Sequence, residues 1–289
     1  MFLTSVLYFS TDYSLTKRYN NSSEIQRKNN MKKYFLKFIS IISLISVLLS
    51  VSVSAAAPKD KCWYVRRNGS CQPSFPEEAE SLKQYNCYYI DERYGDQTPE
   101  KRIYLTFDAG YENGNIEKIL DVLKEEEVPA AFFILDYIIL KNTDLVTRMS
   151  DEGHLVCNHT KKHKNLSNSS KEEIKEDLQA LEKIYYEKTG RQMSKYFRFP
   201  EGRYSESAVK AVCELGYKTV FWSFGYDDWD DRRQPNPEAA KRKILTNTHN
   251  GAIILLHPTS ATNAKILGDV IKEWKALGYT FGTLDDLSS

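Results

Sequence analysis

The sequence lacks an excess of charge of either sign, since its 289 residues include 40 Lys and Arg and 39 Asp and Glu. This balance argues against a protein that binds nucleic acid through a basic surface. The charge is uneven along the chain: residues 1–57 hold seven basic and two acidic residues, and residues 58–289 hold 33 and 37. The larger segment is mildly acidic. With 41% hydrophobic residues, the chain has enough apolar side chains for a packed core.

Cysteine is scarce and lacks metal-binding spacing. The five cysteines form no C-x-x-C pair, which argues against a cysteine zinc site. Their odd number excludes a disulfide set that uses all of them. Cys62 and Cys71 flank a short turn signal and can pair in an oxidising compartment, and the pairing among these two and Cys87 stays open. Cys157 and Cys213 lie in apolar patterns typical of core thiols.

The chain also lacks internal repeats, low-complexity linkers and a glycine-rich phosphate loop. Its long uncharged run, residues 38–57, follows three lysines and ends in small residues. This order predicts an export signal at residues 31–57 that is cleaved after Ala55, the alternative being an uncleaved membrane anchor. Met31 is the better start, so residues 1–30 are interpreted as a disordered upstream extension. Either outcome places the rest of the chain outside the cytoplasm.

Beyond residue 100, short apolar runs alternate with helical patterns. The alternation predicts a parallel α/β fold, and the number of units favours a barrel over an open sheet. Residues 58–99, rich in aromatic side chains, are expected to form an N-terminal extension packed on a barrel of residues 100–289. The expected strands are 103–107, 130–135, 154–157, 195–199, 219–223, 252–256 and 280–281, and the expected helices are 116–127, 145–151, 171–188, 205–215, 237–246 and 263–277.

Polar side chains follow most of these strands at their carboxyl ends, where the chemistry of such folds gathers. Three of the five histidines are among them, and the set as a whole indicates a metal-assisted hydrolase. Asp227 is interpreted as part of a solvated loop face. The residues at these ends are Asp108, His159, His163, Arg198, Pro200, Gly202, Asp227, Asp228, Trp229 and His257.

His159 and His163 are four residues apart, a spacing that places both imidazoles on one side of a helical turn as ligands of a divalent metal. Taken alone, the pair is equally well explained as solvent-exposed loop histidines, because three lysines lie beside it.

The remaining polar groups also have two interpretations each. Asp108 is a candidate base or metal ligand, or it caps a turn. His257 is a candidate general acid, or a buried histidine bonded to backbone. Asp228 would orient His257 and raise its pKa, and Arg198 would hold Asp108 ionised. The alternative for each of these two pairs is a structural ion pair.

The strand-end residues belong to five short motifs: TFDAG at 106–110, HTKKH at 159–163, RFPEG at 198–202, DW at 228–229 and LH at 256–257. Together and in this order, they resemble the five motifs of the polysaccharide deacetylases, the NodB-type enzymes of carbohydrate esterase family 4. Two longer segments, YLTFDAGYENG at 104–114 and GAIILLHPTS at 251–260, are similar to the delta-lactam-biosynthetic de-N-acetylases of spore-forming bacteria.

The resemblance implies a deformed (β/α) barrel that removes N-acetyl groups from peptidoglycan sugars. In that branch the sugar is N-acetylmuramic acid of the spore cortex, whose freed amine closes to muramic δ-lactam. It implies a divalent metal, with zinc expected, held by His159 and His163. Asp108 would take a proton from the attacking water, and His257 would give one to the leaving amine. A backbone N–H near 201–202 would stabilise the oxyanion. The substrate contacts that it implies are Tyr111, Pro200, Glu201, Gly202, Arg203, Trp229 and Leu256.

Two departures from the family pattern affect the site. A second, metal-binding aspartate is usual after the first, and here the residue is Ala109, with Glu112 as a candidate substitute ligand. Glu201 stands where an aromatic, basic or amide residue is usual. Its carboxylate would repel the lactyl carboxylate of a muramoyl sugar, and Arg203 would serve that group instead.

Two other functions remain open. One is a general N-acetylglucosamine or chitin-type deacetylase. The other is a non-catalytic wall-glycan binding protein that lost the metal carboxylate at Ala109, and the retained acid and base residues argue against it. The expected partners are peptidoglycan glycan strands and no nucleic acid. The expected state is a monomer in the cell wall or spore cortex, with membrane contact only through an uncleaved N-terminal segment.

Overall fold

The computed structural model describes residues 27, 31–33 and 60–288. The chain divides into two units, residues 1–56 and 57–289, and the second holds the packed domain. The expected export signal and upstream extension lie almost entirely outside the described residues. Within the described part, no helix combines the length and the apolar character that a membrane crossing needs.

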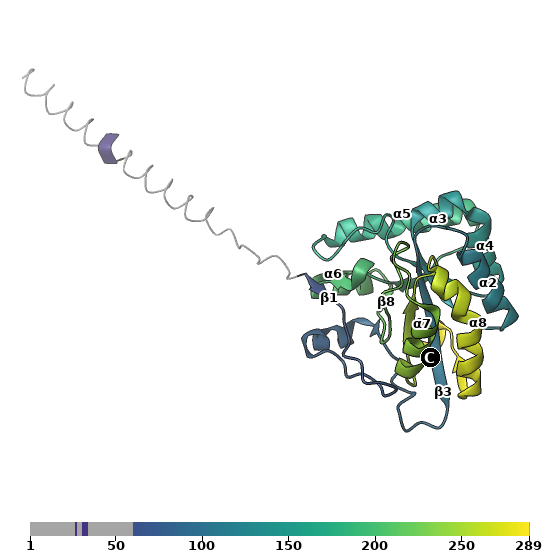
Figure 1. The fold of residues 1–289 in the computed structure, drawn as a ribbon. Coiled ribbons are helices and arrows are strands. Elements are labelled where there is room, and N and C mark those ends of the chain that lie inside the picture. The colour runs from purple at the N-terminus through teal and green to yellow at the C-terminus, as the bar shows by residue number, and fades with distance from the viewer. Residues whose placement is uncertain (1–26, 28–30, 34–59, 289) are drawn as a thin grey trace, which may run out of the picture. The chain divides into compact units, whose positions relative to one another are not determined.

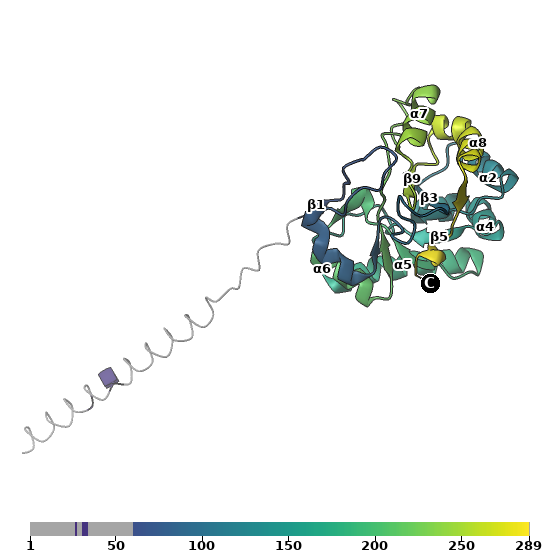
Figure 2. The same cartoon turned by 90° about the horizontal axis from the view of Figure 1, so that it is seen from below.

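Within residues 60–288, an eight-stranded parallel sheet forms the centre of the domain (Figures 1 and 2). The strands run in the order β10-β3-β4-β5-β6-β8-β2, and β9 pairs with β3 beside β10. Their bounds are β2 Cys87–Tyr88, β3 Lys101–Ala109, β4 Ala131–Ile134, β5 Leu155–Asn158, β6 Ser194–Phe197, β8 Lys218–Val220, β9 Ile253–Leu256 and β10 Tyr279–Phe281.

The sheet curls because the chain after β8 turns to meet β9. Ser223 N–H donates to Ile253 O at 3.0 Å, and Leu255 N–H donates to Phe224 O at 2.8 Å. These bonds draw the two ends of the sheet together without a regular strand. The expected deformed barrel is therefore confirmed.

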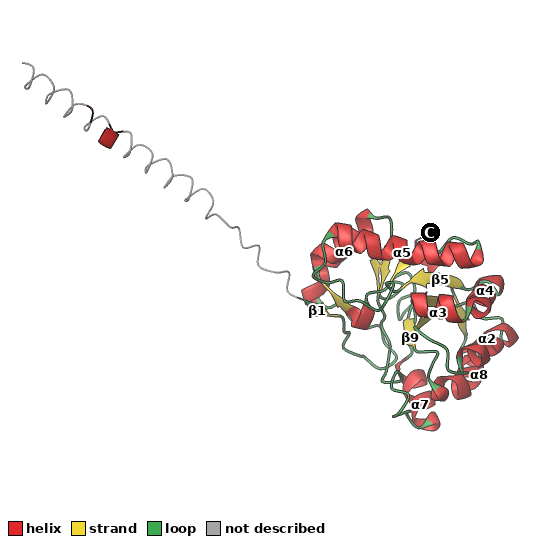
Figure 3. Ribbon diagram, turned by 90° about the horizontal axis from the view of Figure 1, so that it is seen from above, coloured by secondary structure: helices red, strands yellow, loops and turns green. Residues whose placement is uncertain are grey.

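Helices surround the strands on the outside of the curled sheet (Figure 3). Most of them begin at a side chain that caps a free N–H group of the first turn. The side chains of Ser170, Ser205, Asn236 and Ser260 each accept a hydrogen bond from the backbone N–H of the residue three positions later. The helices are α2 Ile116–Glu125, α3 Asp136–Lys141, α4 Thr143–Asp151, α5 Lys171–Thr189, α6 Glu206–Glu214, α7 Pro237–Asn247 and α8 Ala261–Ala276. Within residues 60–288, the 3₁₀ segments are η1 Glu77–Tyr85, η2 Pro200–Gly202 and η3 Leu284–Ser288.

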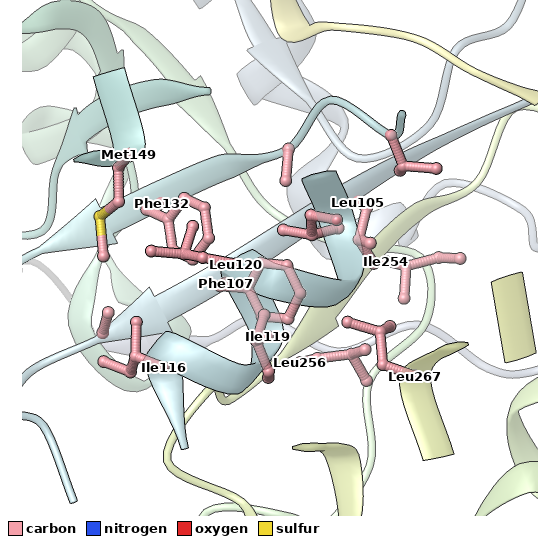
Figure 4. Packing of buried hydrophobic residues seen from close by; sticks show 14 of the residues in the cluster. Leu105, Phe107, Ile116, Ile119, Leu120, Phe132, Met149, Ile254, Leu256 and Leu267 are labelled. Carbon is pink, nitrogen blue, oxygen red and sulfur yellow. The ribbon is translucent and has the colours of Figure 1, made fainter. Parts of the chain in front are cut away.

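The largest apolar cluster lies between β3, β4, β9 and the helices α2, α4 and α8 (Figure 4). The apolar stripe of α2 expected from its 3.6-residue period is buried against Phe107 and Phe132 of the sheet. This packing fixes β3 and β9, the two strands whose carboxyl ends carry Asp108 and His257.

The N-terminal extension packs on one side of the domain. Its first strand, β1 (Lys61–Cys62), pairs antiparallel with β7 (Arg203–Tyr204), and η1 packs on α6 (Figure 2). Trp63 stacks on Phe221 with ring centroids 4.3 Å apart. No disulfide joins the cysteines of the described part; all five thiols are free.

Several elements of the structure differ from those expected. The six-residue helix α3 is not predicted, because it is too short to show a helical period. The two-residue strands β1, β2 and β7 carry no alternation signal for the same reason. The strand expected at 219–223 ends at Val220, because the backbone changes its partner from β2 to β9.

Candidate active site

The carboxyl ends of the strands line a cavity of about 710 Å³. Asp108 lies near the end of β3, His159 directly follows β5, and His257 directly follows β9. The strands are parallel, so these ends meet at one edge of the sheet. His163 lines the same cavity. The structure therefore brings together groups separated by up to 149 positions in the chain.

Asp108 is held by a fully buried arginine. Arg198 Nη1 donates to Asp108 Oδ1 at 2.8 Å, and Nη2 donates to Thr106 Oγ1 at 2.9 Å. Nε donates to Val220 O at 2.9 Å, which fixes the guanidinium plane. Burial works to raise the pKa of the Asp108 carboxyl, but the charge of Arg198, aided by two histidines, lowers this pKa below its usual value. Asp108 is therefore ionised at neutral pH.

His257 is held by a second buried charge. Its Nδ1 lies 2.7 Å from Asp228 Oδ1, and its backbone N–H donates to Oδ2 at 2.8 Å. Asn263 Nδ2 also donates to Asp228 Oδ2, at 2.6 Å. Burial works to lower the pKa of His257, but the hydrogen bond and charge of Asp228 outweigh it and raise the pKa. With Nδ1 engaged, Nε2 is the nitrogen left to meet a substrate.

His159 and His163 lie with their ring centroids 5.1 Å apart. His159 Nδ1 is 2.8 Å from Arg198 O, and a carbonyl only accepts, so this nitrogen carries the proton. Burial lowers the pKa of His159 to about 4, so the ring is neutral at neutral pH. Its unprotonated Nε2 faces Asp108 Oδ2 at 3.5 Å.

The segment between the two histidines is not a helical turn, and that expectation is wrong. Thr160 and His163 both have left-handed backbone angles, with φ of 68° and 57°. Lys161 O accepts from Asp136 N–H, and Lys161 N–H donates to Asp177 Oδ1, so neighbouring elements hold this irregular loop. The rings come close through the loop rather than through a helical period.

Of the substrate contacts implied by the resemblance, Tyr111, Glu201 and Trp229 line the cavity, and Trp229 is 58% exposed. The other four are not among the residues that line it. Leu256 is buried in the core, and its neighbour Leu255 lines the cavity instead.

The remaining three implied contacts are buried or held by other residues. Pro200 is buried. Gly202 is also enclosed: a Cβ at this position would lie 2.8 Å from the Trp222 ring, and its N–H donates to Phe199 O. Arg203 is turned away, because its Nε donates to Asp60 Oδ2 at 3.0 Å.

Glu112 does not replace the missing aspartate at Ala109. Its carboxylate accepts the backbone N–H groups of Gly114 and Ile116, and so caps the start of α2. Ala109 itself is fully buried. Across residues 27, 31–33 and 60–288, no group of three or more His, Cys, Asp or Glu side chains is arranged to hold a metal ion.

Several lining residues are not among the substrate contacts that the resemblance implies, among them Arg67, Trp222 and Asp227. Arg67 comes from the N-terminal extension, Trp222 from the aromatic segment after β8, and Asp227 from the loop that the sequence indicates as a solvated face. Asp227 is exposed and lines the cavity. Its position next to Asp228 is the sequence signal for a place in the site. No sequence signal marks Arg67, which reaches the cavity only through the tertiary fold.

Comparisons with known proteins identify the family of the chain. A family model described as polysaccharide deacetylase matches residues 95–220. The chain is 37% identical over 259 residues to the peptidoglycan-N-acetylmuramic acid deacetylase PdaA of Bacillus subtilis, covering 87% of this chain and 96% of that protein. The solved structure of that protein, described as a family 4 carbohydrate esterase, matches with a TM-score of 0.74 at 38% identity, over 79% of this chain and 97% of that one.

Two other relatives differ in their described activity. A Bacillus cereus peptidoglycan-N-acetylglucosamine deacetylase is 33% identical over 193 residues, covering 65% of this chain and 88% of that protein. A Bacillus anthracis structure described as a pseudoenzyme of the same esterase family matches with a TM-score of 0.62 at 26% identity, over 70% of this chain and 69% of that one. The family expected from the motifs is confirmed: the chain belongs to the polysaccharide deacetylases and is a carbohydrate esterase of family 4.

Proposed function

We propose that this protein is a peptidoglycan de-N-acetylase that acts on N-acetylmuramic acid. The observation that carries the proposal is that Asp108 and His257 open onto one cavity, each fixed by a buried partner of opposite charge. One group is an ionised carboxylate and the other a histidine with a raised pKa, which are the base and the acid that amide hydrolysis needs. The name of the B. subtilis relative supports the muramoyl substrate.

The imidazole and carboxylate groups of the site are donor types that a divalent metal binds, and members of this family generally depend on such an ion. His159 Nε2 and Asp108 Oδ2 face each other at 3.5 Å with no proton between them, an arrangement of two acceptors that a cation would stabilise. We assign His159 and His163 as the protein ligands, with zinc as the expected metal. When bound there, such an ion supplies Lewis-acid activation of a water molecule and of the amide carbonyl.

The chain's own residues carry the proton transfers. Asp108 Oδ2 accepts a proton from the attacking water, while Arg198 holds the carboxylate ionised and in place. His257 Nε2 donates a proton to the nitrogen that leaves with the sugar, so the C–N bond breaks to give acetate and a free amine. The Gly202 N–H is occupied by Phe199, which makes the Glu201 N–H the candidate donor to the oxyanion.

The setting that follows from this function is the cell wall. Residues 31–57 would export or anchor the chain, residues 58–99 would form the extension, and residues 100–289 the deacetylase domain. In a spore cortex, the freed amine would attack the neighbouring lactyl carboxyl and close to muramic δ-lactam with loss of water.

Metal removal tests the proposed activity. We expect peptide-free peptidoglycan strands to release acetate in the presence of the protein, and this release to stop after treatment with a chelator and to return when zinc is added. Mass spectrometry of the strands should place the lost acetyl groups on muramoyl residues. Loss from glucosaminyl residues would instead indicate a general deacetylase. Glycan binding without acetate release under any divalent metal would indicate a wall-glycan binding protein.

A further inference from the structure

Arg67 is the one Lys or Arg among the described residues that line the active-site cavity. The acidic lining groups are Asp108, Glu201 and Asp227. Asp108 is bound to Arg198, so two exposed carboxylates and one arginine face the space where a sugar would lie. A positive charge in this position has no use in the proton transfers of the reaction.

The backbone that carries Arg67 is fixed against the barrel. Trp63 stacks on Phe221, and its Nε1 donates to Trp222 O at 2.9 Å. Arg67 itself lies over the Phe224 ring, with its guanidinium carbon 5.3 Å from the ring centroid, and its Nη2 donates to Gly225 O. The side chain is therefore held beside the segment that leads to Asp228.

The charge of Arg67 is not neutralised. Arg67 forms no ion pair with any residue between 60 and 288, and one of its five N–H donors is used by Gly225. Arg203, to which the sequence assigns the anionic group, is instead paired with Asp60, and its Nη1 lies 3.9 Å from Glu201 Oε2. Arg67 therefore has free donors for an anion in the cavity, whereas the charge of Arg203 is paired with Asp60 and Arg203 is not a lining residue.

The geometry points to Arg67 as the residue that binds the lactyl carboxylate of the muramoyl sugar and so sets the preference for muramoyl over glucosaminyl residues. This inference rests on the proposed function. The lactyl ether and the acetamide stand on adjacent ring carbons, so a sugar whose acetamide meets Asp108 presents its carboxylate to the same cavity. A guanidinium matches a carboxylate in charge and in planar geometry. A glucosaminyl residue has a hydroxyl at that carbon and gains nothing from the charge.

The test compares the Arg67→Gln and Arg67→Lys variants with the wild type, all as the full chain, on two substrates. One is peptide-free glycan with free lactyl carboxyls, and the other is the same glycan with these carboxyls converted to methyl esters. We expect Arg67→Gln to lower kcat/KM about tenfold on the free acid, mainly through KM, and to leave the ester unchanged. Arg67→Lys should recover part of the loss. Arg66→Gln is the matched control, because Arg66 is exposed and is not a lining residue.

An equal loss on both substrates would mean that Arg67 only supports the fold around Gly225, and would overturn the inference. A wild-type protein with the same kcat/KM on the free acid and on the ester would also overturn the inference. If no acetate is released from any glycan, the proposed function fails, and the affinities of wild type and Arg67→Gln for the two glycans, measured by calorimetry, decide the role of Arg67 separately. In that case a tenfold weaker binding of the free acid alone supports it, and equal binding overturns it.

Discussion

Replacing Asp108 with asparagine is expected to lower kcat for acetate release by about 10³-fold or more. The substitution removes the group that we propose accepts the proton of the attacking water, and base catalysis of this kind is worth about 10² to 10⁴-fold. The amide oxygen can still accept the bond from Arg198 Nη1, so the buried guanidinium keeps a partner. The loss should therefore appear in turnover and not in folding.

Acetate release and glycan affinity, measured on the same preparation, check this expectation. Asp144→Asn is the matched control, because Asp144 is an exposed carboxylate in the first turn of α4 and is not a lining residue. Its activity should match that of the wild type. An Asp108→Asn variant that keeps more than about a tenth of the wild-type kcat would mean that another group is the base. Unchanged glycan affinity in an inactive variant would separate the loss of chemistry from a loss of binding.

The sequence predicts the site residues that follow strands, because the topology of a parallel sheet dictates where strand ends go. Asp108 and His257 lie far apart in the chain, and each directly ends or follows an apolar run. Once the runs are identified as parallel strands, both side chains must approach the same edge. The buried partners Arg198 and Asp228 follow from charge, since a carboxylate and a histidine near a strand end need a group that fixes their protonation.

The loop between the histidines shows where spacing fails as a guide. A separation of four residues fits a helix, but the left-handed angles of Thr160 and His163 depend on bonds from α3 and α5 that no local pattern contains. Arg67 shows the same limit over a longer distance. Its contact with Gly225 joins residues 158 positions apart, and the sequence around it has no feature that marks a ligand.

The second large effect concerns His257, whose replacement with alanine is expected to lower kcat by about 10²-fold or more. The sugar nitrogen is a poor leaving group unless it is protonated as the C–N bond breaks, and His257, which lines the cavity, is the proton donor that we propose. Glycan affinity should change less than turnover. A variant with wild-type kcat would mean that the proton comes from another group.

Asp228→Asn tests the pairing that makes His257 an acid. The charged ring is stabilised by the carboxylate at 2.7 Å and disfavoured by burial, so removal of the carboxylate charge leaves burial to lower the pKa of His257. Because the protonated ring is the active form in the proposed mechanism, we expect activity to be lost as the pH rises through this pKa. The basic limb of the profile of kcat/KM against pH should therefore move to lower pH in Asp228→Asn, and the His257→Ala profile should lack this limb. A limb that stays in place in Asp228→Asn would show that His257 does not depend on this carboxylate for its charge, and the assignment of His257 as general acid would lose its physical basis.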